Sequence, residues 1–410
     1  MYHPRSFATL SVAEAAEGVC ELLWIVDTSN DEVSSMSRLL RRLGTVVDIA
    51  GLSLDESSAL IAEAGPDGIL ALADDLLDTT ACIAGNLGLP FLSTEAANLL
   101  TDKLAQRKAF EEAGIEIPTV IPIQIPVSQQ DVETIIERAR FPSVLKPRSG
   151  EASRNTSFVE TANELRNQLK DLSNEDGSPN RQYILESYIP DAVEPIAGIG
   201  FAGYVSVESI VSAGVVSHLA VTGRTPMAEP FRETSAFIPA ELSANDQVAV
   251  MELANRAVHA MKVSIGCVHT EIKLTPDGPR VIEVNGRIGG HVPHTLSTST
   301  GIEILPLAMR VALGEMIVFE TLPECSKLGY VLHYHAPMIV RRITSVSGLE
   351  LLRGNSGVDE VILNRGPGQT VDWHEGSFGH VFSVSGAVLD HDALRELLRT
   401  IADTVRIEGE

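Results

Sequence analysis

Residues 268–290 read "VHTEIKLTPDGPRVIEVNGRIGG", and this stretch decides the fold prediction. Apolar and β-branched residues on both sides of a proline–glycine turn at 276–279 predict two antiparallel strands. Side chains at alternate positions of a strand point to the same face. Glu283, Asn285 and Arg287 alternate in this way, so a carboxylate, an amide and a guanidinium should line one side of the second strand.

The first strand should add a second carboxylate, because Glu271 is expected opposite Glu283 or Asn285. Adjacent carboxylates raise the pKa of one of the pair unless a cation lies between them. Carboxylate and amide oxygens suit Mg²⁺, and Arg287 could hold a phosphoryl group or a tetrahedral oxyanion. The alternative is a solvated acidic strand pair with an arginine salt bridge. The second glutamate, the arginine and the Gly289–Gly290 pair favour the metal site.

Composition excludes several classes of protein. The chain has 410 residues and a formal net charge of −24, which argues against binding a nucleic-acid backbone. Its length predicts two to four domains. No apolar run reaches the roughly 18 residues that a membrane span needs, and the N-terminus carries acidic residues where a signal peptide is apolar. The four cysteines are widely separated, so we expect no CxxC motif and a reducing, cytoplasmic location.

Residues 1–95 are expected to form a Rossmann-like domain, because strands and helices alternate as in a covered parallel sheet. The expected strands are 21–27, 45–51 and 68–72, and the expected helices are 35–43, 54–64 and 75–87. No GxGxxG follows the first strand, so dinucleotide binding is not supported.

Two further domains are expected, at 96–326 and at 327–410. In the middle domain we expect a helix from Thr101, as its cap, to Gly114, as its stop. The other middle-domain elements are helices at 129–139, 161–172 and 244–262, strands at 143–150 and 182–191, a polar loop at 173–180 and a hairpin at 204–223. The last domain should be α+β, with strands at 329–335, 358–363 and 378–384 and a helix at 391–404.

Five stretches, in order along the chain, carry a family resemblance. They are "TDKLAQRKAFEEAGIEIP" (101–118), "SVLKP" (143–147), "YILESYI" (183–189), the hairpin at 268–290 and "TGIEILPLAMRVALGE" (300–315). Between residues 21 and 404 the sequence resembles the ATP-grasp superfamily, and within it the carboxylate–amine ligases of the L-amino-acid ligase type. The resemblance implies an α/β and α+β multidomain protein in which an ATP-grasp fold follows a Rossmann-like pre-ATP-grasp domain and precedes a C-terminal α+β domain. It also implies a lid subdomain at about 120–190.

The resemblance assigns ATP contacts to lysines, to a hinge and to the lid. Lys103 and Lys146 match the two ATP-binding lysines, although each could instead be a surface charge. Backbone groups of the hinge around Glu186, Ser187, Tyr188 and Ile189 would meet the adenine, and Glu194 would hold the ribose. Glu271, Glu283 and Asn285 match the Mg²⁺ ligands and Arg287 the catalytic arginine.

The lid departs from the family pattern, because "RSGEASRNTSF" (148–158) contains a single glycine where the family is glycine-rich. Ser153 and Arg154 match a Ser–Arg pair that is common there, and Arg154 could replace backbone amides as a phosphate contact. Solvated loop charges are the alternative. Asn155 stands where glycine is common and tolerates left-handed backbone better than most residues.

Substrate contacts are expected from two places outside the hairpin. His291 and His294 follow the glycine pair and could face the acceptor substrate. Arg224 and Glu233 lie in a proline-broken polar loop at 222–234, which could equally be an ordinary surface loop. No histidine group has a cysteine or carboxylate at zinc spacing, so no zinc site is expected.

The expected activity is ATP-dependent amide formation between an amino acid, or a related acid, and an amine, through an acyl phosphate. ATP and Mg²⁺, or Mn²⁺ in its place, are the expected cofactors. The expected partners are small molecules and a second copy of the chain, with neither nucleic acid nor membrane. The alternatives are a biotin carboxylase-like or purine-pathway carboxylating enzyme and a nucleotide-binding protein without turnover. A biotin carboxylase would carry a long run of lid glycines, which this chain lacks.

Overall fold

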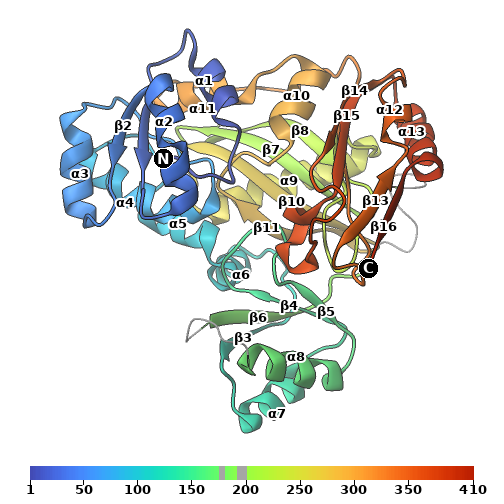
Figure 1. Ribbon diagram of the computed structural model, residues 1–410. Helices are drawn as coiled ribbons and strands as arrows, with labels where there is room; N and C mark the ends of the chain where they lie inside the picture. Colours follow the sequence, from blue (N-terminus) through green and yellow to red (C-terminus); the bar gives the residue numbers. More distant parts are fainter. Residues whose placement is uncertain (175–180, 192–200) are drawn as a thin grey trace.

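A computed structural model describes residues 1–174, 181–191 and 201–410 (Figure 1). Most of the polar loop expected at 173–180, and the expected ribose contact Glu194, lie outside these described residues. Within the described part of the chain, no helix is both long and apolar enough to cross a membrane.

The N-terminal part packs helices around two parallel strands. Its elements are α1 (Thr9–Ala16), β1 (Leu23–Val26), α2 (Asp31–Leu43), β2 (Thr45–Asp48), α3 (Leu54–Glu63), the 3₁₀ turn η1 (Asp74–Leu76), α4 (Leu77–Leu87) and α5 (Thr94–Thr101). β1 pairs with β2 in parallel, as the alternation of strands and helices predicted. Asp74, at the start of η1, is buried.

The third strand expected at 68–72 does not form, which corrects the prediction. The segment is partly buried, but it pairs with no strand of the sheet. The chain's first residues lie beside it: the Met1 amino group donates to Leu70 O (2.5 Å), and Tyr2 N–H donates to Ile25 O of β1 (2.9 Å). The hydrophobic run therefore predicted a buried segment correctly. However, the backbone of β1 is bonded to Tyr2 instead of to this segment, so no third strand forms.

A small lobe forms around a four-stranded antiparallel sheet with the order β3-β6-β4-β5 (Figure 1). Its elements are β3 (Val120–Ile125), α7 (Gln129–Arg138), β4 (Ser143–Pro147), β5 (Ser157–Val159), α8 (Ala162–Asn174) and β6 (Arg181–Ser187). Leu145, Leu165 and Leu169 are fully buried in its core. The strand expected at 143–150 ends at Pro147, so the residues after it are a loop free to approach a ligand.

The largest layer is an eight-stranded sheet with the order β11-β10-β7-β8-β9-β12-β15-β14. Its strands are β7 (Tyr204–Ser212), β8 (Val215–Gly223), β9 (Ser235–Ile238), β10 (Gly266–Thr275), β11 (Gly278–Asn285), β12 (Leu328–Tyr334), β14 (Val358–Leu363) and β15 (Phe382–Val388). The sheet runs through β9 and β12, across the domain boundary expected at 326. The domain limits therefore stay a prediction, while one sheet joins both parts physically.

Helices and a small second sheet complete this part of the molecule. They are α6 (Lys103–Glu112), α9 (Ala244–Ala260), α10 (Val292–Thr300), α11 (Ile304–Ala312), β13 (Ile343–Ser347), α12 (Leu349–Leu352), η2 (Trp373–Gly379), α13 (His391–Thr404) and β16 (Arg406–Gly409). The strand expected at 378–384 begins only at Phe382, because Phe378 and Gly379 belong to η2. Figure 1 shows the N-terminal part on the left, the C-terminal strands on the right and the small lobe below.

The hairpin β10–β11 forms with the expected pairing but a shifted turn. Glu271 lies directly opposite Glu283, one of the two registers expected. Gly278 already pairs with Thr275, so the connection is the two residues between them rather than a turn centred at 277–278. A register shift after Glu271 accommodates one extra residue in β11, as a β-bulge does.

The helix expected from Thr101 to 113 is two helices, and the predicted cap is wrong. α5 ends at Thr101, and Asp102 caps α6 by accepting from the backbone N–H groups of Leu104 and Ala105 (3.0 and 3.3 Å). An aspartate is a stronger cap than threonine. The break puts Lys103 at the first turn of α6, where its side chain faces the cavity described next.

Candidate active site

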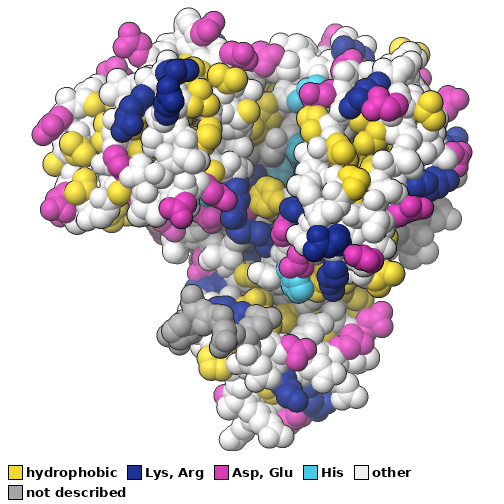
Figure 2. Space-filling view, in the orientation of Figure 1, with side chains coloured by type: hydrophobic (Ala, Val, Ile, Leu, Met, Phe, Trp, Pro, Cys, Tyr) yellow, Lys and Arg dark blue, Asp and Glu magenta, His cyan; other side chains and the backbone are white. Residues whose placement is uncertain are grey.

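A cavity of about 430 Å³ opens where the hairpin, the small lobe, the segment before η1 and η2 meet. Figure 2 shows the hollow between the N-terminal and C-terminal parts, with Lys, Arg and His side chains along it. Most residues expected at the site line it: Lys103, Lys146, Ser153, Arg154, Glu186, Ser187, Tyr188, Ile189, Arg224, Glu233, Glu271, Glu283, Arg287, Gly289, Gly290 and His291. Segments from residue 103 to residue 291 therefore converge on one space.

Lys103 reaches the cavity from the first turn of α6. Its Nζ donates to Gly150 O (2.7 Å) in the loop after β4 and lies 3.4 Å from a Glu283 carboxylate oxygen. Lys103 N–H also donates to Arg148 O (3.0 Å), and Arg148 Nε donates to Asp102 (2.7 Å). The cap of α6 is thus tied to the loop, so this lysine is held in place and is no ordinary surface charge.

Lys146 belongs to a buried cluster of charges between β4, β6 and α6. Glu186 accepts from Lys146 Nζ (2.8 Å) and from Arg107 Nε (2.7 Å), and Arg107 Nη2 also donates to Ile282 O (2.6 Å). Burial alone would raise the pKa of Glu186, but Arg107 and Lys146 together lower it to about 2. Burial lowers the pKa of Lys146, and Glu186 opposes this shift. The lysine therefore stays paired at the cavity wall.

Several polar groups of the expected adenine hinge are already bonded to other parts of the protein. The Glu186 side chain is taken by Arg107 and Lys146, so a nucleotide could meet only its backbone. The N–H groups of Ser187 and Tyr188 donate to Thr119 O and Pro142 O (both 2.9 Å).

The acidic pair on the hairpin has an asymmetric charge environment. Burial raises the pKa of Glu271, and the facing Glu283 raises it further. Burial also opposes the charge of Glu283, but Lys103 and Lys146 outweigh it and lower its pKa to about 2. Asn285 Nδ2 lies 3.4 Å from Glu283 Oε1. Asn285 itself is buried and is not among the residues that line the cavity.

These three residues fit a hard divalent cation on chemical grounds. Two facing carboxylates are stabilised by a cation between them, and the Asn285 amide can turn its oxygen toward the same point. Among the described residues, however, no group of three or more His, Cys, Asp or Glu side chains is arranged to hold a metal. The protein thus supplies an incomplete oxygen set, as Mg²⁺ sites that share phosphate oxygens do.

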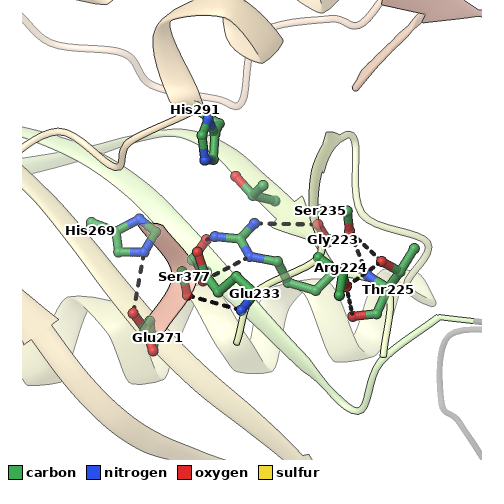
Figure 3. Close-up of polar contacts among 12 residues, drawn as sticks. Gly223, Arg224, Thr225, Glu233, Ser235, His269, Glu271, His291 and Ser377 are labelled. Carbon is green, nitrogen blue, oxygen red and sulfur yellow. Dashed lines mark hydrogen bonds and ion pairs between the residues drawn. The ribbon is translucent and has the colours of Figure 1, made fainter. Parts of the chain in front are cut away.

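Glu271 is also held from behind by a buried histidine. His269 Nδ1 lies 2.8 Å from Glu208 Oε2, and its Nε2 lies 3.6 Å from Glu271 Oε1 (Figure 3). Burial disfavours the imidazolium, but Glu208 and Glu271 raise the pKa of His269 to about 9. A Cβ at Gly289 would lie 2.6 Å from His269 Nδ1, so the first glycine of the pair is required by this packing. A Cβ at Gly290 would meet nothing within 4 Å.

Arg287 projects toward η1 and the loop after β4. Its Nε donates to Asp74 Oδ2 (2.8 Å) and lies 4.0 Å from Glu151 Oε2. Burial opposes the positive charge, but Asp74 and Glu151 outweigh it and raise the pKa of Arg287. The N-terminal part therefore anchors this arginine at the cavity, a contact that the hairpin pattern alone could not reveal.

The lid loop adopts the left-handed backbone expected at Asn155, where φ is 52°. Ala152 and Ser153 share it, each with φ 55°. Non-glycine residues in this conformation are strained, and such strain persists only where surrounding contacts maintain it. Arg154 Nε is buried without a hydrogen-bond partner in the described part of the chain. The loop thus presents a donor that a bound anion could satisfy.

Arg224 and Glu233 come from the loop between β8 and β9 and lie together on one wall (Figure 3). Arg224 Nη2 donates to Ser206 Oγ (3.0 Å), and its Nε lies 3.5 Å from Glu233 Oε1. Glu233 N–H donates to Ser377 Oγ (3.0 Å) on η2. Burial would raise the pKa of Glu233, but Arg224 lowers it. A guanidinium and a carboxylate are therefore both charged at the cavity.

Only one of the two histidines expected at the substrate site lines the cavity. His291 lines the cavity, and its Nε2 lies 2.8 Å from His333 Nε2 on β12. His294 is exposed on α10 and does not line the cavity, which corrects the expectation that it faces a substrate. On a helix, residues three apart share a face, but His291 precedes the first full turn of α10, so the helical spacing does not apply to it.

Sequence reasoning missed several residues that hold the site. Four of these residues belong to no local motif, because each acts through a partner from a distant segment. They are Arg107, Asp74, Glu208 and Ser377. The available signal was the position of Arg107 three residues before Phe110, on the face of α6 that is buried, since a fully buried arginine needs a partner.

The comparisons with known proteins agree with this geometry. Residues 139–295 match the model of the ATP-grasp domain. The crystal structure of L-amino acid ligase from Bacillus licheniformis superposes with a TM-score of 0.77, at 20% identity, over 97% of this chain and 95% of that one. Residues 139–295 therefore contain an ATP-grasp domain, and the chain has the multidomain ATP-grasp fold of mixed helices and sheets seen in that ligase structure.

A synthase and a ligase are among the relatives that resemble this chain in sequence. Carnosine synthase 1 of Homo sapiens is 26% identical over 276 residues, which are 63% of this chain and 32% of that protein. Alanine–anticapsin ligase of Bacillus subtilis (strain 168) is 26% identical over 236 residues, 55% of this chain and 49% of that protein. The chain thus spans between a third and a half of the length of these relatives.

Proposed function

We propose that this chain is an ATP-dependent carboxylate–amine ligase that forms an amide bond through an acyl phosphate and releases ADP and phosphate. One observation carries the proposal: Lys103, Lys146, the Glu271–Glu283 pair and Arg287 line a single cavity. The similarity to carnosine synthase, alanine–anticapsin ligase and an L-amino acid ligase supports the same class of reaction.

The nucleotide would lie along the wall that joins the small lobe to α6. Lys103 and Lys146 would contact phosphate oxygens as compact cations, and Arg154 Nε would gain the partner it lacks. At the hinge, the engaged N–H groups of Ser187 and Tyr188 leave Ile189 as the residue to donate to the adenine edge. A homodimer and a cytoplasmic location remain predictions.

Glu271, Glu283 and Asn285 would hold Mg²⁺, which when bound would supply positive charge against the phosphates during transfer. His269 would keep Glu271 oriented, because its other nitrogen is fixed by Glu208. Lys103 lies between Glu283 and the lid loop, so it would link the acidic pair to the closing of the loop over the phosphates.

The reaction would take place beside Arg287. A substrate carboxylate oxygen attacks the γ-phosphorus, and ADP leaves with the electron pair of the broken bond. The amine of the second substrate then attacks the carbonyl carbon, and phosphate leaves. Arg287, preorganised by Asp74, would stabilise the negative charge that develops on the substrate oxygens in both steps. The closed lid would exclude water that otherwise hydrolyses the acyl phosphate.

Arg224 and Glu233 favour amino acids as substrates. The carboxylate of an acyl donor reacts, so its ammonium group remains for binding and suits Glu233. The amine of an acyl acceptor reacts, so its carboxylate remains for binding and suits Arg224. The two groups lie 3.5 Å apart at one wall, so a pair of amino acids could be held head to tail. A matrix of amino acid pairs, assayed for phosphate release with mass spectrometry of the products, identifies the substrates.

Glu283→Gln tests the proposal at the metal site. The substitution keeps the shape of the side chain but removes the charge that pairs with Lys103 and the cation, so ADP release should fall by at least about 10²-fold. ADP release with the pooled amino acids is the measurement.

The control is Glu252→Gln, which changes an exposed glutamate of α9 and should leave the rate unchanged. Near wild-type turnover of Glu283→Gln would exclude the metal assignment. Release of ADP by the wild-type chain only with bicarbonate would instead identify a carboxylating enzyme, and no release with any pool would identify a binding protein.

A further inference from the structure

Four imidazoles form a row along the cavity wall made by α10, β12 and the segment before β15. The ring of His333 lies 4.2 Å from that of His291 and 4.3 Å from that of His380, measured between centroids. His335 lies beyond, 6.1 Å from His380. His291 and His380 line the cavity, whereas His333 is buried behind them. The row joins segments about 90 residues apart in sequence, and the proposed reaction described so far does not use it.

The contact between His291 and His333 requires at least one uncharged ring. Two Nε2 atoms at 2.8 Å can share a hydrogen bond only if one donates and the other accepts. Burial lowers the pKa of His291 to about 4 and that of His333 well below its usual value. With Nε2 occupied by His333, the ring nitrogen that His291 can offer to a ligand is Nδ1. When Nε2–H donates to His333, that Nδ1 carries a free lone pair.

The charged groups that face His291 are those already placed for amino acids. Glu233 and Arg224 come from the loop between β8 and β9, His380 from the segment before β15 and His294 from α10 itself. Figure 3 shows His291 above the Arg224–Glu233 pair. An acceptor whose carboxylate is bound by Arg224 therefore has its amine, one carbon away, on the side of His291.

Amide formation needs a base at this point. As the amine lone pair joins the carbonyl carbon, the nitrogen becomes positively charged and strongly acidic, and it must lose one proton before the product forms. We propose that His291 Nδ1 is the general base that takes this proton from the attacking amine, and that His333 positions it. The C–N bond forms, the C–O bond to phosphate breaks, and phosphate leaves with that electron pair. His291 then returns the proton to the departing phosphate, so the imidazole is neutral again.

This inference rests on the proposed ligase function and concerns its second step. The first step, phosphoryl transfer to a carboxylate, needs no proton removal from nitrogen. Hydroxylamine separates the two steps, because it is unprotonated at neutral pH and its nitrogen becomes acidic enough on attack to lose a proton to water. It therefore traps the acyl phosphate as a hydroxamate without a positioned base.

The experiment compares His291→Asn with the wild-type chain, using the mixed proteinogenic L-amino acids, ATP and Mg²⁺, with and without excess hydroxylamine. Hydroxamate formation should stay within about twofold of wild type, and amide formation should fall by about 10²-fold or more, the usual contribution of a general base. His294→Asn, an exposed histidine three residues further on, is the matched control and should change neither.

The outcomes separate the two hypotheses. Loss of both products in His291→Asn, or of neither, overturns the role of His291 while leaving the ligase in place. If the wild-type chain itself forms neither hydroxamate nor amide, the proposed function fails and the inference fails with it.

His333 is tested separately as a positioning residue. His333→Phe removes the hydrogen bond to His291 but keeps an aromatic ring, so amide formation should fall by about tenfold while hydroxamate formation persists. The pH at which amide formation reaches half its maximum should also shift, because the ring that fixes the His291 tautomer is gone. His333→Gln can replace the bond and should restore both the rate and the pH profile. An unchanged profile in His333→Phe would overturn the positioning role.

Discussion

At the scale of single residues, the site depends on charges held from outside the hairpin. Arg107 is fully buried, yet it neutralises Glu186 and ties β11 to α6 through Ile282 O. A buried charge pair adds little to stability by itself, but removing one partner leaves the other unpaired, at a cost of about 3–5 kcal/mol. Arg107 lines the cavity itself, and through Glu186 it also fixes where Lys146 lies.

Gly289 and Gly290 give a prediction at this scale. In Gly289→Ala, the new Cβ would lie 2.6 Å from His269 Nδ1 and 2.8 Å from Val292 Cγ2, so the buried His269–Glu208 contact must shift. Overpacking of this kind typically costs about 1–3 kcal/mol. The free energy of unfolding in urea should fall by that amount. Gly290→Ala, whose Cβ meets nothing within 4 Å, is the control, and equal effects of the two variants would refute the packing argument.

At the scale of elements, η2 connects the lid loop to the loop that carries Glu233. Ser377 N–H donates to Ala152 O (2.9 Å) in the lid, and Ser377 Oγ accepts from Glu233 N–H (3.0 Å). These bonds help to maintain the left-handed backbone of the lid at Ala152 and Ser153. The C-terminal part therefore helps to set the conformation of the proposed phosphate lid, which lacks the glycines expected there.

Gly376→Ala tests this connection. Gly376 has φ 63°, and a Cβ there would lie 2.0 Å from Ala152 O, so the lid loop must move away from η2. A shift of about 1 Å at a catalytic loop can cost as much as 10²-fold, and we expect kcat/KM for ATP to fall at least about tenfold. Gly368→Ala is the matched control, because Gly368 has φ 88° but open space around it. If both variants lose activity equally, backbone strain rather than lid contact is the cause.

At the scale of the whole molecule, the eight-stranded sheet brings the histidine row to the site, and it makes stability depend on pH. Burial lowers the pKa of His291 and of His335 to about 4 each, whereas an unfolded histidine titrates near 6.5. Between these values the unfolded chain binds protons that the folded chain does not. The stabilisation from the neutral rings is therefore fully present above about pH 6.5 and is lost as the pH falls toward 4.

We accordingly expect the free energy of unfolding to decrease between pH 6.5 and pH 4, by up to about 1.4 kcal/mol per pH unit for each such histidine. Denaturant unfolding at intervals across this range measures it. His335→Asn removes one of the groups and should flatten the slope while leaving stability near pH 8 less affected. The same slope in the variant and the wild-type chain would show that other groups cause the acid sensitivity.

Much of the fold followed from local patterns. The hairpin at 268–290, the helix expected at 244–262 and the hairpin expected at 204–223 all form, because periodicity, capping and turn chemistry act over a few residues. The two failures had different causes, the first tertiary and the second local. The segment at 68–72 is as apolar as a strand but has no free partner, and the stronger cap Asp102 divides the helix expected from Thr101.

The sequence by itself determined which chemical groups the site contains. The polar side chains that alternate along β11, and the lysines before them, can be read directly from the order of residues. Only the tertiary structure decided how those groups are held. Asp74 fixes Arg287, Glu208 fixes His269, and β12 brings His333 to His291. Their partners lie between 42 and 213 residues away along the chain. Contacts at such separations depend on how sheets and helices pack, and no local pattern of residues records that.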